Sequence, residues 1–112
     1  MSMSEAVIVY TTFPDMAAAQ QVCKTVIAER LAACANIFPS MTAIYEWQGT
    51  LETEQECAVF LKTRQSAAEN LMRHLKREHP YDTPAILVIP LSAVDQDYGA
   101  WISQQIGTAG KL

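Results

Sequence analysis

One segment constrains the fold of this chain more than any other, because residues 51–63 alternate between two series of side chains without a break. The odd positions carry Leu, Thr, Gln, Cys and Val, whereas the even positions include Glu52, Glu54, Glu56 and Lys62. A period of two is that of a β-strand. Strands of globular proteins usually span about five or six residues, so this one must extend beyond whatever covers the rest of its sheet.

A second long strand precedes this one and should pair with it as a hairpin. Residues 34–47 are rich in apolar and aromatic side chains, and the Gln-Gly-Thr triplet at 48–50 is a turn signal. Pro39 interrupts the run. Because proline cannot donate a ladder hydrogen bond, we expect a bend or bulge there on an edge strand. A projecting hairpin with an apolar face also needs a partner to cover it.

Further strands and helices flank the hairpin. Residues 6–12 form a β-branched apolar run typical of a strand buried on both faces. An apolar stripe at helical spacing predicts a helix over residues 15–31, capped by Asp15. A capping box of Ser66 and Glu69 predicts a second helix that ends near residue 78. The remaining predictions are a core strand over residues 85–91 and a short helix, capped by Asp95 or Asp97, that carries Tyr98, Trp101 and Ile102.

The predicted order is β-α-β-β-α-β followed by a short helix, which is an α+β arrangement. It packs most simply as a four-stranded antiparallel sheet with both helices on one face, the ferredoxin-like architecture. A length of 112 residues suits one domain. We therefore expect a single domain over residues 1–112, with its core over about 6–103 and a frayed tail over 107–112.

Composition narrows the classes of function. Eight Lys and Arg against twelve Asp and Glu give a net charge of −4 without a basic cluster, which disfavours nucleic acid as a partner. No segment suits a membrane span, and residues 1–5 do not resemble a secretory signal. Three widely spaced cysteines fit neither a disulfide framework nor a paired zinc motif. These features predict a cytoplasmic protein with reduced thiols and no membrane partner.

His79 is the best candidate for metal chemistry. It follows Glu78 at the end of the second predicted helix and precedes a Pro-Tyr turn that would fix its imidazole. A histidine there equally suits a structural role, in which it compensates the helix dipole or bonds to the backbone. Two ligands do not make a tight site, so a metal here would need ligands from elsewhere in the fold or from another subunit. Cys34 is a weaker candidate, because a small thiol beside alanines is more often part of the core.

The deeper part of the hairpin offers a second candidate site. Like charges on one strand face are costly unless cations oppose them, and the glutamates near the turn suit a solvated face. Glu56 and Lys62 lie deeper, and they suit a ligand or metal pocket as well as a solvated face. A cleft could also be lined by the aromatic residues Tyr45, Trp47, Tyr81, Tyr98 and Trp101, although aromatic residues in a small domain are usually packing anchors. Trp47 is the exception, because it lies near the turn and would otherwise be exposed.

Motifs of the common enzyme classes are missing. The sequence has no Gly-rich phosphate loop, no Gly-x-Ser-x-Gly elbow and no His-Glu-x-x-His helix, and it has only two histidines. We therefore expect a protein that is not an enzyme.

Five short strings follow one another in a single register between residues 6 and 103. They are Leu-Ala-Ala-Cys at 31–34 with Asn-Ile at 36–37, Tyr-x-Trp-x-Gly-x-Leu-Glu at 45–52, Leu-Lys-Thr at 61–63, His-Pro-Tyr-x-x-Pro at 79–84, and Asp-Tyr-x-x-Trp at 97–101. Together they are far more specific than any one of them. The chain resembles the CutA family of divalent-cation tolerance proteins.

The resemblance implies a ferredoxin-like fold, a homotrimer built through the long hairpin strands, a cytoplasmic location and tolerance to copper and other divalent cations. Copper-binding members of the family carry a Cys at the end of the first strand and two His before the Pro-Tyr turn. The matching positions here are Thr11, Glu78 and His79, of which only His79 is unchanged. Loss of a thiolate and an imidazole should weaken the binding of soft copper, although Glu78 could still ligate a divalent ion.

Two functions follow as hypotheses. The first is a non-enzymatic trimer that binds copper(II) or another divalent cation, with His79 and Glu78 as ligands and subunits that pool their ligands. The second is a regulatory or scaffold trimer that binds a small molecule or a partner protein at clefts between subunits. Those clefts would be lined by Trp47, Glu56 and Lys62, and their role in binding is inferred by analogy with other trimers of this fold.

Overall fold

The structure, a computed structural model, describes residues 5–107 and confirms the predicted order of elements. The predicted frayed tail lies outside the described residues except for Gly107, whose N–H donates to the carbonyl of Arg30 at 3.1 Å. Among the described residues, no helix is long and apolar enough to cross a membrane. The elements are β1 (Ala6–Phe13), α1 (Met16–Ala28), β2 (Cys34–Trp47), β3 (Thr50–Arg64), α2 (Gln65–Glu78), β4 (Ile86–Pro90) and α3 (Gln96–Gln105).

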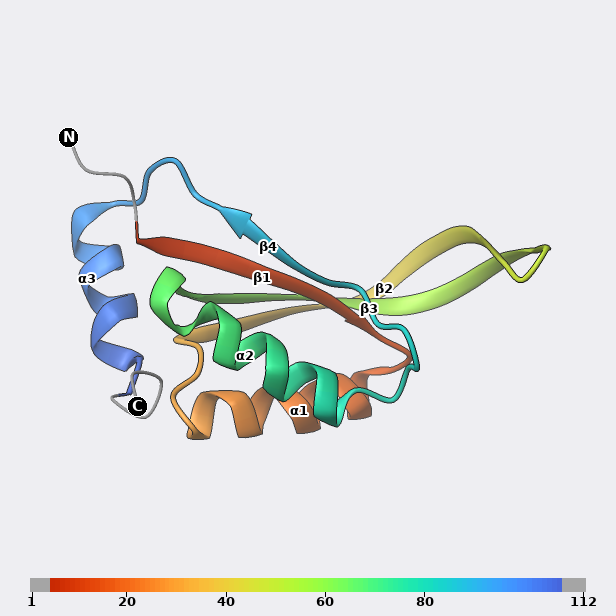
Figure 1. Ribbon diagram of the computed structural model, residues 1–112, viewed down its shortest axis with the longest axis horizontal. Helices are drawn as coiled ribbons and strands as arrows, with labels where there is room; N and C mark the ends of the chain where they lie inside the picture. The colour runs from red at the N-terminus through yellow and green to blue at the C-terminus, as the bar shows by residue number, and fades with distance from the viewer. Residues whose placement is uncertain (1–4, 108–112) are drawn as a thin grey trace.

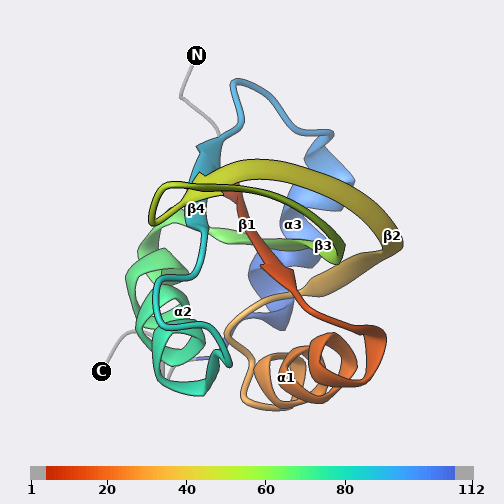
Figure 2. The same cartoon turned by 90° about the vertical axis from the view of Figure 1, so that its right-hand side faces the viewer.

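The four strands form one antiparallel sheet in the order β2-β3-β1-β4. Helices α1 and α2 lie side by side on one face of this sheet, as Figure 2 shows, and α3 packs at one end of it (Figure 1). This is the predicted ferredoxin-like α+β fold. The opposite face of the sheet, which we call the open face, is not covered by α1 or α2.

The core lies between the sheet and the two helices. Odd-numbered residues of β1 and β3 point into it, which matches the predicted alternation: Val9, Phe13, Val59 and Leu61 are fully buried. Leu71 of α2 and apolar residues of α1 meet them from the other side. A smaller cluster of Ala6, Ala33 and Ile102 attaches α3 to the sheet.

The hairpin of β2 and β3 projects beyond the helices, as expected from the length of its strands (Figure 1). Gln48 and Gly49 form its turn with φ values of 51° and 85°, the left-handed backbone that a two-residue hairpin loop requires. The register shifts between Phe38 and Met41, so Pro39 lies at a bulge in edge strand β2, as predicted. The bulge separates the sheet-forming half of the hairpin from its projecting half.

Two local predictions are wrong. The first helix ends at Ala28 because Arg30 takes a left-handed φ of 59° and turns the chain toward β2. Ser66 does not cap α2, which begins directly after β3 without a side-chain cap at Arg64. The N–H of Gln65 donates to the carbonyl of Glu5, just before β1, at 2.7 Å. Backbone pairing therefore continues up to the first residue of α2, and Ser66 already lies inside the first turn of the helix rather than at its cap.

The open face of the sheet is apolar. The first strand was expected to be buried on both faces, but Ile8 and Tyr10 on the open face remain partly exposed. Tyr10 packs against Phe60 with ring centroids 5.3 Å apart, and Phe60 packs against Phe38 at 5.6 Å. Leu87 of β4 pairs with Tyr10 and is 54% exposed. An apolar row therefore crosses the whole sheet on this side.

Candidate functional site

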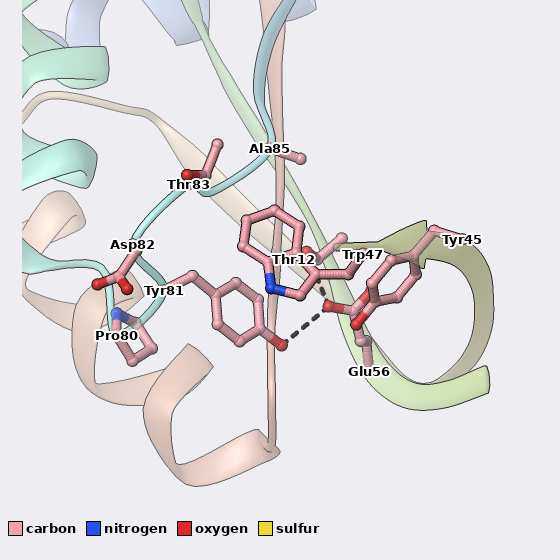
Figure 3. A pocket seen from close by; sticks show the side chains of 9 residues that line it. All are labelled: Thr12, Tyr45, Trp47, Glu56, Pro80, Tyr81, Asp82, Thr83 and Ala85. Atoms are coloured by element: carbon pink, nitrogen blue, oxygen red, sulfur yellow. Dashed lines mark hydrogen bonds between the residues drawn. The ribbon is translucent and has the colours of Figure 1, made fainter. Parts of the chain in front are cut away.

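A hollow of about 520 Å³ lies where the loop after α2 meets the end of β1 and the projecting half of the hairpin (Figure 3). Three parts of the chain that are distant in sequence supply its walls. The rings of Tyr45, Trp47 and Tyr81 gather around the carboxylate of Glu56 in this view. The lining residues are Thr12, Tyr45, Trp47, Glu56, Pro80, Tyr81, Asp82, Thr83 and Ala85.

Glu56 is held in the hollow by two hydroxyl groups. Its Oε2 accepts a hydrogen bond from the Tyr81 hydroxyl at 2.8 Å and another from Thr12 Oγ1 at 3.3 Å. Burial and the hydrogen bond to Glu56 both raise the pKa of Tyr81, so its phenol keeps the proton that it donates. The carboxylate is therefore fixed as an acceptor beside the aromatic rings.

The hairpin side of the hollow is aromatic and electronegative. Trp47 is 49% exposed and Tyr45 is 42% exposed, a high exposure for rings of this size. Desolvation raises the pKa of Tyr45, and the negative charges of three hairpin glutamates raise it further. The carboxylates of β3 thus act together on this surface. In order of effect on Tyr45 they are Glu54, Glu52 and Glu56.

His79 lies beside this hollow and faces the end of β1. Its ring stacks on Phe13 with centroids 4.5 Å apart and an interplanar angle of 12°. Nδ1 accepts the backbone N–H of Tyr81 at 3.2 Å, so the ring proton belongs on Nε2, which lies 3.1 Å from Thr11 Oγ1. Burial lowers the pKa of His79. The imidazole is therefore neutral, with both nitrogens engaged.

The lowered pKa of His79 predicts a specific loss of stability in acid. The unfolded chain, with the ordinary histidine pKa of 6.5, binds the proton more readily than the folded one. We expect the free energy of unfolding to be highest above pH 6.5 and to fall as the pH drops through the lower pKa of the folded chain. Urea denaturation between pH 7.5 and pH 5 should show a shallower pH dependence in His79→Gln, while Glu78→Gln, at an exposed neighbour, keeps the original one. Equal slopes in all three proteins would contradict this account.

The structure brings together two of the three proposed metal-ligand positions at the end of α2. The Thr11 hydroxyl is buried and contacts the His79 imidazole. Glu78 is exposed and lines a different hollow, on the side of α1, together with His74. Within residues 5–107, no group of three or more His, Cys, Asp and Glu side chains is placed to hold a metal ion. The residues of one chain therefore do not fit a chelating site.

Cys34 and Lys62 lie at the other end of the sheet. Cys34 pairs with Lys62 across β2 and β3, and its thiol contacts Asn36 Oδ1 at 3.6 Å. Lys62 Nζ donates to the Tyr98 hydroxyl at 3.1 Å and lies 5.3 Å from the centre of that ring. Strands rise by about 3.3 Å per residue, so Lys62 and Glu56 are roughly 20 Å apart along β3. Of the four predicted cleft residues, one chain brings together Tyr45, Trp47 and Glu56 but not Lys62.

Sequence reasoning missed Thr12 and Asp82 as lining residues, and it missed the bond from Tyr81 to Glu56. The signal for Thr12 is the register of β1 and β3, because Thr12 opposes Ala58 and so shares a face with Glu56. That register is not readable from composition or periodicity. Tyr81 comes from a loop, and a loop's approach to a sheet cannot be inferred from its own sequence.

Comparison with known proteins agrees with the fold and with the sequence motifs. The CutA1 divalent ion tolerance protein family matches residues 7–105. The divalent-cation tolerance protein CutA of Citrobacter koseri is 44% identical over 106 residues, which are 95% of this chain and 92% of that protein.

Solved structures give the same answer. The crystal structure of CutA1 from Pyrococcus horikoshii is 42% identical, with a TM-score of 0.87 over 90% of this chain and 98% of that one. The periplasmic divalent cation tolerance protein CutA from Archaeoglobus fulgidus is 29% identical, with a TM-score of 0.88 over 91% and 99% of the two chains. By sequence and by structure, the chain belongs to the CutA1 divalent ion tolerance protein family.

Proposed function

We propose that this protein acts in divalent-cation tolerance as a cytoplasmic homotrimer that binds copper(II) or another divalent cation and catalyses no reaction. The observation that carries the proposal is the family match over residues 7–105. The cytoplasmic location rests on three free thiols, which a reducing compartment preserves. Because the Archaeoglobus fulgidus relative is called periplasmic, cell fractionation is the direct test of the compartment.

The apolar open face supports the homotrimer. Ordinary monomers seldom expose a contiguous apolar patch as wide as a four-stranded sheet. The hairpin also extends the molecule to 46 Å in a domain only 22 to 27 Å across, and it offers strands that a neighbouring subunit can pack against. The exposed members of the open face are Phe38, Leu87 and Ile89.

The metal ion is proposed to bind between subunits through His79. One chain supplies a neutral imidazole but not a complete ligand set, and both imidazole nitrogens already have hydrogen-bond partners. Binding therefore requires that His79 exchange its bond to Thr11 or to the Tyr81 amide for the metal. Glu78 or a group of a neighbouring subunit would complete the site.

Titration calorimetry with copper(II) and zinc(II) tests this proposal. We expect the tag-free trimer to bind the metal ion with micromolar or tighter affinity. We expect the His79→Gln variant to lose at least one of the metal-binding sites that the wild type has. Cys34→Ser tests the weaker candidate ligand in the same way, because it removes the half-buried thiol at the far end of the sheet and leaves His79 in place. We expect it to keep every metal-binding site of the wild type. Equal binding by wild type and His79→Gln, with both confirmed as trimers, would show that His79 is not a ligand.

A second function is favoured by the hollow around Glu56. Three exposed or half-buried aromatic rings and a carboxylate line it, which is the mixture of apolar walls and few polar groups typical of small-molecule sites. We propose that the trimer also serves as a regulatory or scaffold protein that binds a small molecule there. This function depends on Glu56 and Trp47, whereas the first depends on His79, so single variants separate the two.

A further inference from the structure

The hollow around Glu56 carries negative charge that the chain does not neutralise. Two of its lining residues, Glu56 and Asp82, are acidic, and no Lys, Arg or His lines it within the described residues. No Lys or Arg among residues 5–107 forms an ion pair with Glu56. Figure 3 shows the carboxylates of Glu56 and Asp82 on different sides of the Tyr81 ring. The side chains of one chain therefore repel an anionic ligand here, and a neutral apolar ligand would leave their charge unpaired.

One oxygen of Glu56 remains available as an acceptor. Both hydroxyl donors, from Tyr81 and Thr12, bind Oε2. In the part of the chain that the structure describes, Oε1 accepts no hydrogen bond. A carboxylate held in one orientation by two donors, with its second oxygen free, is arranged to accept a charge-assisted hydrogen bond from a ligand.

The aromatic walls favour the same class of ligand. The face of an aromatic ring is negative, and a cation within about 6 Å of its centre is attracted by about 0.5–2 kcal/mol, most strongly by tryptophan. Tyr45 and Trp47 present rings on the hairpin side, and Tyr81 presents one on the loop side (Figure 3). A volume of about 520 Å³ lies within the range of about 300–1,000 Å³ usual for small-molecule sites.

We propose that this hollow binds a small organic cation, an ammonium group that retains an N–H and is attached to a short apolar chain. The N–H donates to Glu56 Oε1, the aromatic faces of Trp47 and Tyr45 contact the charge, and the apolar chain lies along Tyr81 and Pro80. A divalent metal ion is a poorer occupant, because a single carboxylate with one oxygen already engaged supplies too few ligands. The inference rests on the second proposed function and gives it a ligand class.

Fluorescence titration with butylammonium tests the proposal. The protein has two tryptophans, so Trp101→Phe leaves Trp47 as the only tryptophan reporter in the full-length protein. We expect butylammonium to change the Trp47 emission saturably, and Glu56→Gln to weaken that binding about tenfold or more, since it removes a charge-assisted hydrogen bond. Glu54→Gln is the matched control, because it removes an equal charge from the same strand and does not line the hollow. It should weaken binding less than threefold.

Two further ligands sharpen the test. Tetramethylammonium has the charge but no N–H, so it should bind more weakly than butylammonium, and butyrate should not bind. Trp47→Ala, followed by calorimetry, should weaken butylammonium binding severalfold without unfolding the protein, because the side chain is already half-exposed. The proposal is overturned if butylammonium does not bind at all, if butyrate binds equally, or if Glu56→Gln and Glu54→Gln behave alike. These results leave copper binding at His79 unaffected, so failure here is distinguishable from failure of the metal-binding proposal.

Discussion

Replacement of Leu87 by glutamate is expected to convert the proposed homotrimer into monomers that remain folded. Leu87 lies on the open face of β4, where its partner in β1 is Tyr10. Leu87 is 54% exposed in the single chain, so a glutamate at this position stays hydrated in the monomer. The substitution should therefore change the stability of the monomer little. At a subunit interface the same carboxylate would be buried without a partner, which costs several kcal/mol. Each copy should therefore weaken assembly by about a hundredfold or more.

Light scattering coupled to size-exclusion chromatography measures this result directly. The wild-type protein should elute with the mass of three chains and Leu87→Glu with that of one chain, 12.4 kDa. Circular dichroism should show an unchanged content of helix and strand. Ile27→Glu is the control, because Ile27 is also an exposed apolar residue but lies on α1, on the covered side of the sheet. If both variants stay trimeric, the open face is not the interface; if both dissociate, the effect is not specific to it.

The fold was largely predictable because its strongest signals are local. The alternation in β3 predicts which residues enter the core, and Val59 and Leu61 are buried as expected. Pro39 and Asp15 act as the bulge and the helix cap that their chemistry indicates. The predicted cap at Ser66 fails because α2 already begins at Gln65, whose N–H donates to the carbonyl of Glu5 just before β1, so Ser66 lies inside the helix.

The candidate site was only partly predictable because it depends on register and on a loop. Tyr45, Trp47 and Glu56 meet as expected, since they share one hairpin. Lys62 does not join them in one chain, because six residues along an extended strand place it near Tyr98 instead. Thr11 and His79 meet although 68 positions separate them, whereas Glu78, adjacent to His79 in sequence, faces α1. The side chains of two consecutive residues at the end of a helix point in different directions. Adjacency in sequence therefore does not place two residues in the same metal site.

Replacement of Phe13 by alanine is expected to be the most destabilising single change near the site. Phe13 is fully buried in the main core at the end of β1, and its ring is stacked on His79. Truncation of a buried phenylalanine costs about 3–5 kcal/mol through lost burial and the cavity that remains. It also removes the surface that holds the His79 imidazole against Thr11. The variant should therefore lose both core packing and the position of the imidazole.

Urea denaturation in the monomeric Leu87→Glu background measures this loss, because the stability of a trimer depends on protein concentration. Phe13→Leu, which keeps most of the apolar volume, should cost less than half as much as Phe13→Ala. A double-mutant cycle with His79→Gln isolates the stacked pair, for which we expect a coupling of about 0.5–1.5 kcal/mol. Additive losses would mean that the two rings are adjacent without stabilising each other. His79 would then owe its position to its hydrogen bonds with the Tyr81 amide, Thr11 and the Thr12 backbone, and a metal ion that displaced one of those bonds would loosen the ring.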